Sequence, residues 1–221
     1  SDAASMKSVA EKDGDYYILN GNKMWITHAD QADVSIIFAK TDKEKGARGI
    51  TAFLVDKGTP GFTPQPIHEK IGLRAQDTGE IIMENVRVHK DNMLGPEGKG
   101  FAVAMSALDN ARFTVAAGCV GTAQAALDVA KQYAKDRIQF GKPIAAHQLV
   151  QQLIANAVLE IEMGRLLVYR AGFLKNKEVP NTRETCMAKY FCSEMVNRVT
   201  FNMIQVLGGY GFSGEYPLER M

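Results

Sequence analysis

The hydrophobic pattern of the chain changes near residue 95. Before that point, short runs rich in β-branched and aromatic residues alternate with turn residues, and no stretch keeps the 3.6-residue period of a helix. These runs cover residues 16–19, 23–27, 34–39, 50–55 and 81–88. Glycines and prolines between residues 58 and 66 would interrupt any helix there. The pattern predicts an antiparallel β-sandwich or barrel.

One hairpin is predicted from its turn residues. Asn20-Gly21 separates two short hydrophobic runs, residues 16–19 and 23–27. Asn-Gly is the pair that two-residue hairpin turns favour, because both central residues need positive φ angles. We therefore expect the chain to reverse direction at Asn20-Gly21.

Beyond residue 100 the apolar residues recur in steps of three and four, as on one face of a helix. The pattern predicts three long helices, over residues 101–135, 145–175 and 182–207. Short connections between long helices favour an antiparallel bundle. The chain is thus expected to be an α+β multidomain protein, with a β-rich domain at residues 1–96 and an incomplete helical bundle at 97–221.

The ends of the third helix carry recognisable capping residues. Asn181 can cap its first turn and Glu184 can reach back to complete a capping box. Gly208-Gly209 is expected to end the helix. Pro217 is suited to the first turn of a further helix.

Composition excludes several classes of function. Lys plus Arg (26) nearly balances Asp plus Glu (25), so no general positive field would attract a nucleic acid. Since no run of 18 apolar residues occurs, we expect no membrane span. The three cysteines form no C-x-x-C pair, which fits core packing in a reducing compartment.

The sequence contains few motifs that indicate chemistry by themselves. Residues 209–214 spell G-x-G-x-x-G, but this motif binds a pyrophosphate only after a strand, and here a predicted helix precedes it. A glycine-rich helix end is the favoured interpretation. The four histidines lack metal-binding spacing and no Gly-x-Ser-x-Gly occurs, so neither a metal site nor a serine triad is predicted.

Five segments, in this order, resemble the FAD-dependent acyl-CoA dehydrogenase family. They are Ser1-Asp2-Ala3-Ala4-Ser5, Trp25-Ile26-Thr27, Asp109-Asn110-Ala111-Arg112, residues 137–143 (RIQFGKP) with His147-Gln148, and residues 205–212 (QVLGGYGF) followed by Glu215 and Arg220. The resemblance covers essentially the whole chain. It implies a fragment that lacks the family's N-terminal helical domain and the end of its C-terminal domain.

The resemblance implies oxidation of an acyl-CoA thioester to the trans-2-enoyl-CoA, with electrons passing from FAD to an electron-transfer flavoprotein in a homotetramer. A soluble protein of the bacterial cytoplasm or the mitochondrial matrix would fit. An acyl-CoA oxidase, a flavin monooxygenase or a non-catalytic flavin- or CoA-binding relative would share the scaffold. The implied FAD-binding residues are Trp25, Ile26, Thr27, Arg137, Gln139, Phe140, His147, Gln148, Gln205, Gly208 and Gly209, and the implied substrate-binding residues are Ser1, Asp109 and Arg112.

Several of these residues also have a purely structural interpretation. Trp25 could fill the core of the sheet. Arg112 could pair with Asp109 three residues before it, although an arginine on an apolar stripe would also suit a CoA phosphate or carbonyl. Arg137 could be an ordinary solvated helix end, although its planar guanidinium suits a diphosphate. Gly208-Gly209 could be a helix C-cap, and could also let backbone approach FAD.

The catalytic base is not expected within these 221 residues. Removal of the α-proton needs a carboxylate of raised pKa, which in most family members would lie beyond Met221. A minority place it immediately before the arginine that matches Arg112, and here that position is Ala111. We therefore expect the isolated chain to be inactive.

Overall fold

The computed structural model describes residues 2–221. The chain divides into two compact units, Ser1–Ser106 and Ala107–Met221, called the strand unit and the helical unit below.

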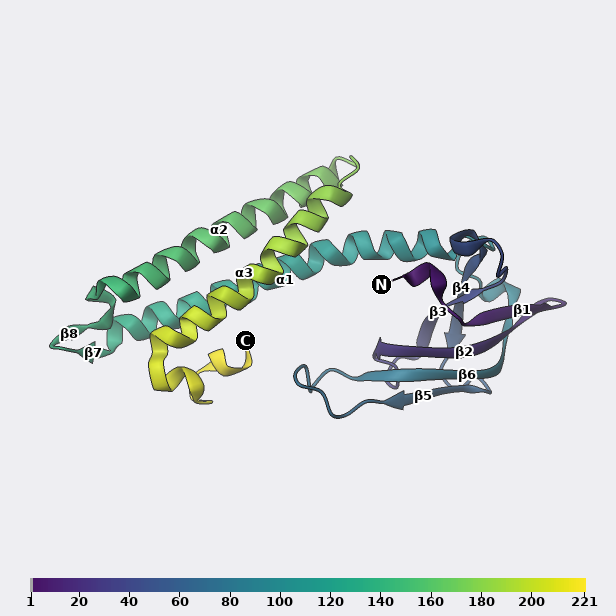
Figure 1. The fold of residues 1–221 in the computed structure, drawn as a ribbon, viewed down its shortest axis with the longest axis horizontal. Coiled ribbons are helices and arrows are strands. Elements are labelled where there is room, and N and C mark those ends of the chain that lie inside the picture. The colour runs from purple at the N-terminus through teal and green to yellow at the C-terminus, as the bar shows by residue number, and fades with distance from the viewer. Residues whose placement is uncertain (1) are drawn as a thin grey trace. The chain divides into compact units, whose positions relative to one another are not determined.

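The strand unit contains one six-stranded sheet (Figure 1). Its strands are β1 (Val9–Asp13), β2 (Tyr16–Thr27), β3 (Val34–Lys40), β4 (Ile50–Asp56), β5 (Phe62–Pro66) and β6 (Thr78–His89), in the spatial order β4-β3-β1-β2-β6-β5. The pairs are antiparallel except that β1 and β3 run parallel. The predicted β-rich region is confirmed, but its sheet is mixed because β3 crosses over and pairs with the far side of β1.

The core of the strand unit joins strands that are distant in the sheet. The Tyr17 ring of β2 packs 5.2 Å, between centroids, from the Phe53 ring of β4. Both side chains are at most 2% exposed. The Tyr17 hydroxyl donates to a Glu97 carboxylate oxygen at 3.0 Å, which ties the segment before the first long helix to this core. Burial of these large side chains removes apolar surface from water and stabilises the sheet.

The hairpin predicted at Asn20-Gly21 is wrong. Residues Tyr16–Thr27 form one continuous strand, and the register shifts between Leu19 and Gly21 as in a β-bulge. Gly21 has a φ of +125°, and a Cβ there would lie 2.9 Å from the Ser8 Cα. The chain instead reverses at Gly14 and Asp15, between β1 and β2. Tertiary packing uses the Asn-Gly pair for a bulge because β6 pairs along the whole of β2.

The helical unit confirms the three predicted helices. They are α1 (Gly100–Asp136), whose first residues belong to the strand unit, α2 (Gln148–Asn176) and α3 (Thr182–Leu207). A hairpin of β7 (Ile138–Gln139) and β8 (Lys142–Pro143) connects α1 to α2 (Figure 1). Side chains of all three helices form one core cluster, including the fully buried Ala123, Ile161 and Met195.

The capping box predicted at the start of α3 does not form. Asn181 makes no capping hydrogen bond through its side chain, and its amide donates to the Val179 carbonyl instead. Glu184 is largely buried and accepts from Arg183 at 2.7 Å, with Arg170 at 3.8 Å. These two arginines lower the pKa of Glu184, Arg183 most strongly, so the carboxylate stays charged and paired.

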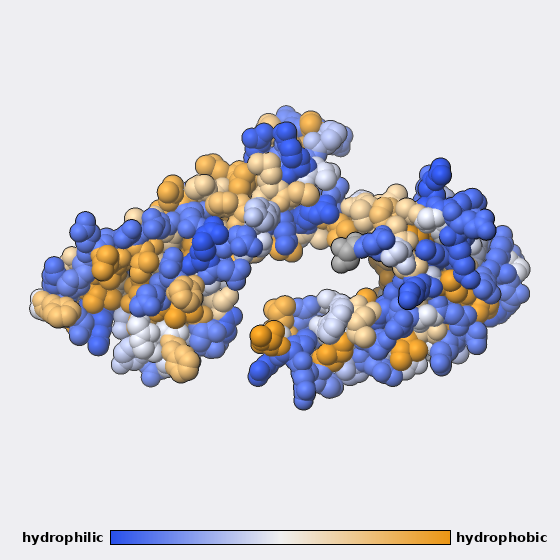
Figure 2. Space-filling view, in the orientation of Figure 1, coloured by the Kyte–Doolittle hydropathy of each residue, from blue (hydrophilic) through white to orange (hydrophobic). Residues whose placement is uncertain are grey.

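Apolar side chains stay exposed along α2. Leu159, Leu166, Tyr169 and Phe173 are each at least 60% exposed, and their spacing places them on one face. Figure 2 shows hydrophobic side chains gathered over the helical unit. An exposed apolar face formed by several large side chains is typical of a surface that another domain or subunit covers.

Helix α1 is long and apolar enough to cross a membrane by length and composition alone. Of its most apolar 18-residue window, 33% is buried. Core helices of soluble proteins pass the same test, so α1 is weak evidence for a span. The expectation of no membrane span stays a prediction.

Candidate functional site

A cavity of about 580 Å³ opens at one end of the helical unit. It lies where the end of α1, the β7–β8 hairpin and the end of α3 meet the 3-10 turn Gly208–Phe212. The cavity is lined by Tyr133, Arg137, Gln139, Ile144, Gln205, Val206, Leu207, Gly208, Gly209, Tyr210 and Ser213. Five of these residues, from two distant stretches of sequence, are ones that the family resemblance implied for FAD.

Gly208 and Gly209 form the open wall of this cavity. Helix α3 ends at Leu207, and Gly208 adopts a φ of +59° that favours glycine. A Cβ added to either glycine would meet no atom within 4 Å. Backbone at this point is therefore accessible to a ligand. The preceding helix also agrees with the interpretation of residues 209–214 as a helix end.

The opposite wall comes from the β7–β8 hairpin. The Ile144 amide donates to the Arg137 carbonyl at 2.9 Å, which fixes the base of the hairpin. Both the Arg137 and Gln139 side chains are exposed, and the Gln139 side-chain amide donates to the Ile138 carbonyl. The cavity thus combines a guanidinium with the amides of Gln139 and Gln205.

Three other implied residues do not line the cavity. Phe140 lies at the tip of the hairpin, 94% exposed, with its ring edge-on to His147 at a centroid distance of 5.8 Å. Gln148 is the first residue of α2 and lines a smaller surface hollow with Gln151. Within this chain the structure does not bring Phe140, His147 and Gln148 onto the cavity wall.

The second implied FAD region lies in the strand unit, where Trp25 is unusually placed. Trp25 is 69% exposed and has a φ of +63°, at a register shift between Lys23 and Ile26. A positive φ is rare for a bulky residue, and such strained residues cluster at functional sites. The exposure rules out the alternative that Trp25 fills the core of the sheet. Ile26 is half-buried against that core instead.

A residue that the sequence did not single out holds Thr27. The Gln76 amide donates to the Thr27 hydroxyl oxygen at 3.1 Å. Lys70 donates to the Gln76 carbonyl and also to the Thr78 hydroxyl oxygen at 3.1 Å, which anchors this loop. No local motif marks Gln76, because it lies 49 residues from Thr27.

The implied substrate residues of α1 form a contact of their own. An Arg112 guanidinium nitrogen lies 2.5 Å from an Asp109 carboxylate oxygen, one helical turn away. The other Asp109 oxygen accepts from the Thr182 hydroxyl at 3.0 Å. The structural interpretation of Arg112 is therefore realised, and no ligand is needed to neutralise it. Ser1, the third implied residue, lies outside the described residues.

Comparison with known proteins identifies the family. Residues 98–221 match the family model described as the C-terminal domain of acyl-CoA dehydrogenase, and residues 1–86 match the one described as its middle domain. The chain is 46% identical over its whole length to the CarC subunit of the caffeyl-CoA reductase-Etf complex of Acetobacterium woodii, covering 58% of that protein. It is 42% identical to the mitochondrial short-chain specific acyl-CoA dehydrogenase of Rattus norvegicus, covering 100% of this chain and 53% of that one.

A solved structure gives the same result. Butyryl-CoA dehydrogenase from Megasphaera elsdenii matches with a TM-score of 0.95 and 44% identity, over 99% of this chain and 57% of that one. The chain belongs to the acyl-CoA dehydrogenase family, and the predicted resemblance is confirmed. It spans about half the length of the relatives that it matches.

Members of this family are FAD-dependent oxidoreductases. The cavity of the helical unit fits part of such a cofactor, because a cationic Arg137 can meet a phosphate and the two amides can meet a heteroaromatic edge. The open backbone at Gly208 and Gly209 leaves room for close approach.

Proposed function

We propose that this chain is part of an acyl-CoA dehydrogenase that oxidises an acyl-CoA thioester to the trans-2-enoyl-CoA. The observation that carries the proposal is the cavity that gathers Arg137, Gln139, Gln205, Gly208 and Gly209. The similarity to butyryl-CoA dehydrogenase over nearly the whole chain supports the reaction type and favours a short acyl chain.

FAD supplies the acceptor for the hydride that leaves the β-carbon. We assign its ring system to Trp25, Ile26 and Thr27, and a phosphate-containing portion to Arg137 with Gly208 and Gly209. The site for the phosphate-containing portion would also include Phe140, His147 and Gln148 only in an assembly that rearranges or covers the β7–β8 hairpin.

Two copies of the chain are proposed to share each cofactor. The β7–β8 hairpin exposes Phe140 almost fully, and α2 exposes an apolar face, as expected of surfaces that meet another subunit. A homotetramer in which the helical unit of one subunit reaches the FAD of another would bury both. An electron-transfer flavoprotein is the proposed electron acceptor, because the CarC relative is named as part of an Etf complex.

The catalytic base is proposed to come from outside these residues. Ala111 precedes Arg112 and carries no group that can accept a proton. Asp109 is already engaged, because it pairs with Arg112 and accepts a hydrogen bond from the Thr182 hydroxyl. Asp109 and Arg112 are therefore proposed to position substrate without exchanging a proton.

The relatives of this chain indicate two alternative cellular compartments for the protein. They include proteins from bacteria and from mitochondria. We propose a bacterial cytoplasmic or mitochondrial matrix enzyme.

The test uses the full-length protein that contains this chain. Anaerobic addition of butyryl-CoA should bleach the visible absorbance of bound flavin, and reoxidation by oxygen should be slow. The proposal would be overturned if the full-length protein contained no bound flavin, or if no acyl-CoA bleached the flavin absorbance. Fast reoxidation by oxygen would identify an oxidase on the same scaffold.

The FAD assignment has a separate test. The Arg137→Gln variant should bind FAD about 10- to 100-fold more weakly, because a hydrogen bond to a charged group contributes roughly 1.5–3 kcal/mol. Arg48→Gln, an exposed arginine of the strand unit, is the matched control and should leave FAD affinity unchanged. Equal affinities for both variants would remove Arg137 from the site.

A further inference from the structure

A second cavity, of about 400 Å³, lies in the strand unit and contains a lysine. Eight of its eleven lining residues are apolar, among them Ile26, Ile36 and Ile81. Lys23 is the one charged side chain in the lining. An ammonium group beside so much hydrocarbon is poorly solvated.

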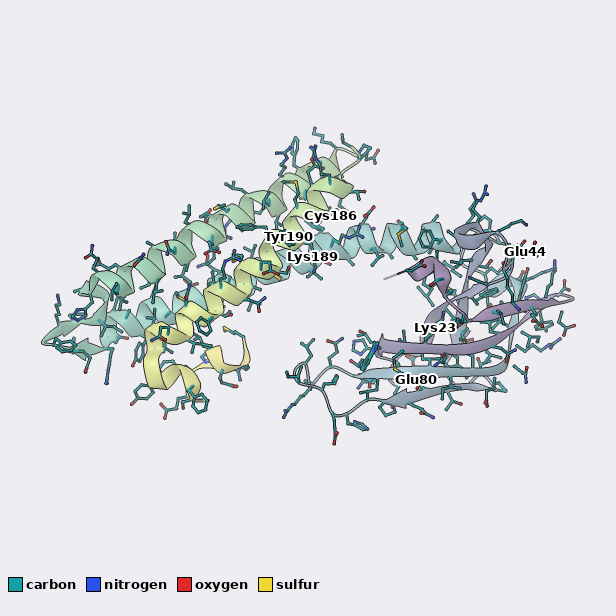
Figure 3. The ribbon with its side chains drawn as sticks, in the orientation of Figure 1. Lys23, Glu44, Glu80, Cys186, Lys189 and Tyr190 are labelled. Carbon is teal, nitrogen blue, oxygen red and sulfur yellow. The ribbon has the colours of Figure 1, made fainter. Side chains whose placement is uncertain are left out.

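Lys23 also lacks the acidic partner that such a group normally has. Within residues 2–221, its side-chain hydrogen-bond contact is a 3.7 Å approach of its Nζ to the Met6 sulfur, a weak acceptor. Glu80 lies on the neighbouring strand (Figure 3), but its carboxylate accepts from the Asn22 amide at 2.7 Å. Successive side chains of a strand point to opposite faces, so Asn22 and Glu80 lie across the sheet from Lys23.

Burial without a counter-charge changes the chemistry of this amine. Desolvation lowers the pKa of Lys23 below its ordinary value, and no coulombic partner opposes the shift. A larger fraction of Lys23 than of a solvated lysine is therefore an uncharged amine, which is the nucleophilic form.

We propose that Lys23 is a site of covalent acylation by acyl thioesters, with the apolar cavity receiving the acyl chain. The proposal rests on the proposed function for the source of the thioester. The Nζ lone pair attacks the thioester carbonyl carbon, a C–N amide bond forms and the C–S bond breaks. CoA leaves as a thiolate that takes up the proton released from nitrogen, so no oxidant or reductant is needed.

Acylation also removes the unfavourable group. The amide carries no charge, so the acylated side chain no longer places an unpaired ammonium in an apolar cavity. The acyl chain fills space bordered by Ile36 and Ile81.

The test compares two thioesters on the full-length protein. Equal concentrations of acetyl-CoA and butyryl-CoA are incubated with it, and acylation of each lysine is quantified by peptide mass spectrometry. Butyryl-CoA should modify Lys23 roughly tenfold more than acetyl-CoA, because two further methylene groups are buried. The exposed Lys12 should show no such preference. Equal reaction of Lys12 and Lys23, or no chain-length preference at Lys23, would overturn the inference.

A variant places a carboxylate in the cavity. Ile36→Glu should suppress acylation of Lys23, because a carboxylate in the lining stabilises the ammonium form. Ile71→Glu changes a fully exposed isoleucine outside the cavity and should leave acylation unchanged. Equal acylation of Lys23 in the two variants would contradict a role of the cavity in this reaction.

Flavin bleaching by butyryl-CoA in the same sample separates the two claims. Bleaching without acylation of Lys23 overturns only the inference. Acylation of Lys23 with the butyryl preference, but without bleaching, supports the inference and overturns the proposed function.

Discussion

At the scale of single residues, the structure distinguishes between interpretations that the sequence left open. Trp25 was equally compatible with a core position and a ligand contact, and its 69% exposure excludes the core. Arg112 lies 2.5 Å from Asp109, as its structural interpretation expects, and its role in binding substrate stays a prediction. Both outcomes depend on the direction of a side chain, which a residue's type does not determine.

Gln76 is predicted to set the orientation of the Thr27 hydroxyl. Gln76→Ala should weaken FAD binding about fivefold and shift the flavin reduction potential, because one neutral hydrogen bond contributes roughly 1 kcal/mol. Gln65→Ala, an exposed glutamine of β5, is the control. In a Thr27→Val background, Gln76→Ala should have no further effect. A full effect in that background would show that Gln76 acts elsewhere.

Cys192 is predicted to destabilise the protein at alkaline pH. Burial, with a smaller contribution from Cys119, raises the pKa of Cys192 from 9.0 to about 11. In the unfolded chain this thiol loses its proton first, so the folded state binds more protons and its stability falls between pH 9 and 11.

Urea unfolding on both sides of pH 9 measures this effect. Cys192→Ala should reduce the loss of stability with rising pH, whereas Cys186→Ala should not, because Cys186 is exposed on α3 (Figure 3). Identical pH dependences in the two variants would assign the effect to other groups.

At the scale of elements, local signals were reliable for helices and less so for turns. The helical periods predicted α1, α2 and α3 to within a few residues. Asn20-Gly21 forms a bulge inside β2. There the Asn20 side-chain oxygen accepts from the Asn85 backbone N–H at 2.8 Å. A short turn motif is easily overridden because pairing along β6 involves many more hydrogen bonds than one turn.

Two glycines of the 3-10 turn after α3 are predicted to affect different properties. Gly211 affects the stability of the fold, and Gly209 affects cofactor binding. In Gly211→Ala the new Cβ would lie 2.5 Å from the Ile204 carbonyl oxygen, so the turn must shift, at a cost of about 1–3 kcal/mol. In Gly209→Ala the Cβ meets no atom, so stability should be unchanged while the methyl group weakens FAD binding.

Thermal unfolding and FAD titration measure the two properties. A Gly209→Ala variant that keeps full FAD affinity would contradict the placement of FAD against this turn.

At the scale of the whole molecule, two separate cores stabilise the chain. The core cluster of the helical unit and that of the strand unit share no residue. We propose that the boundary between the two domains lies at residues 96 and 97, in the segment before α1.

The two cores are predicted to respond separately to mutation. Phe53→Ala should destabilise the strand unit by about 3–5 kcal/mol, and Met195→Ala should destabilise the helical unit by about 2–5 kcal/mol, since both side chains are fully buried. Hydrogen exchange should accelerate in β1–β6 for the first variant and in α2 and α3 for the second. Faster exchange throughout the chain in both variants would show a single cooperative unit.

The sequence alone determined the division into a β-rich and a helical part, the approximate limits of the three long helices and the family, because hydrophobic period and motif order are local properties of the chain. It also brought together Arg137, Gln139, Gln205, Gly208 and Gly209 as one set, although only by resemblance. Only the tertiary structure decided that β1 and β3 are parallel, that Asn20-Gly21 is a bulge, and that Gln76 holds Thr27. Each of these depends on contacts between residues far apart in the chain, which no local pattern encodes.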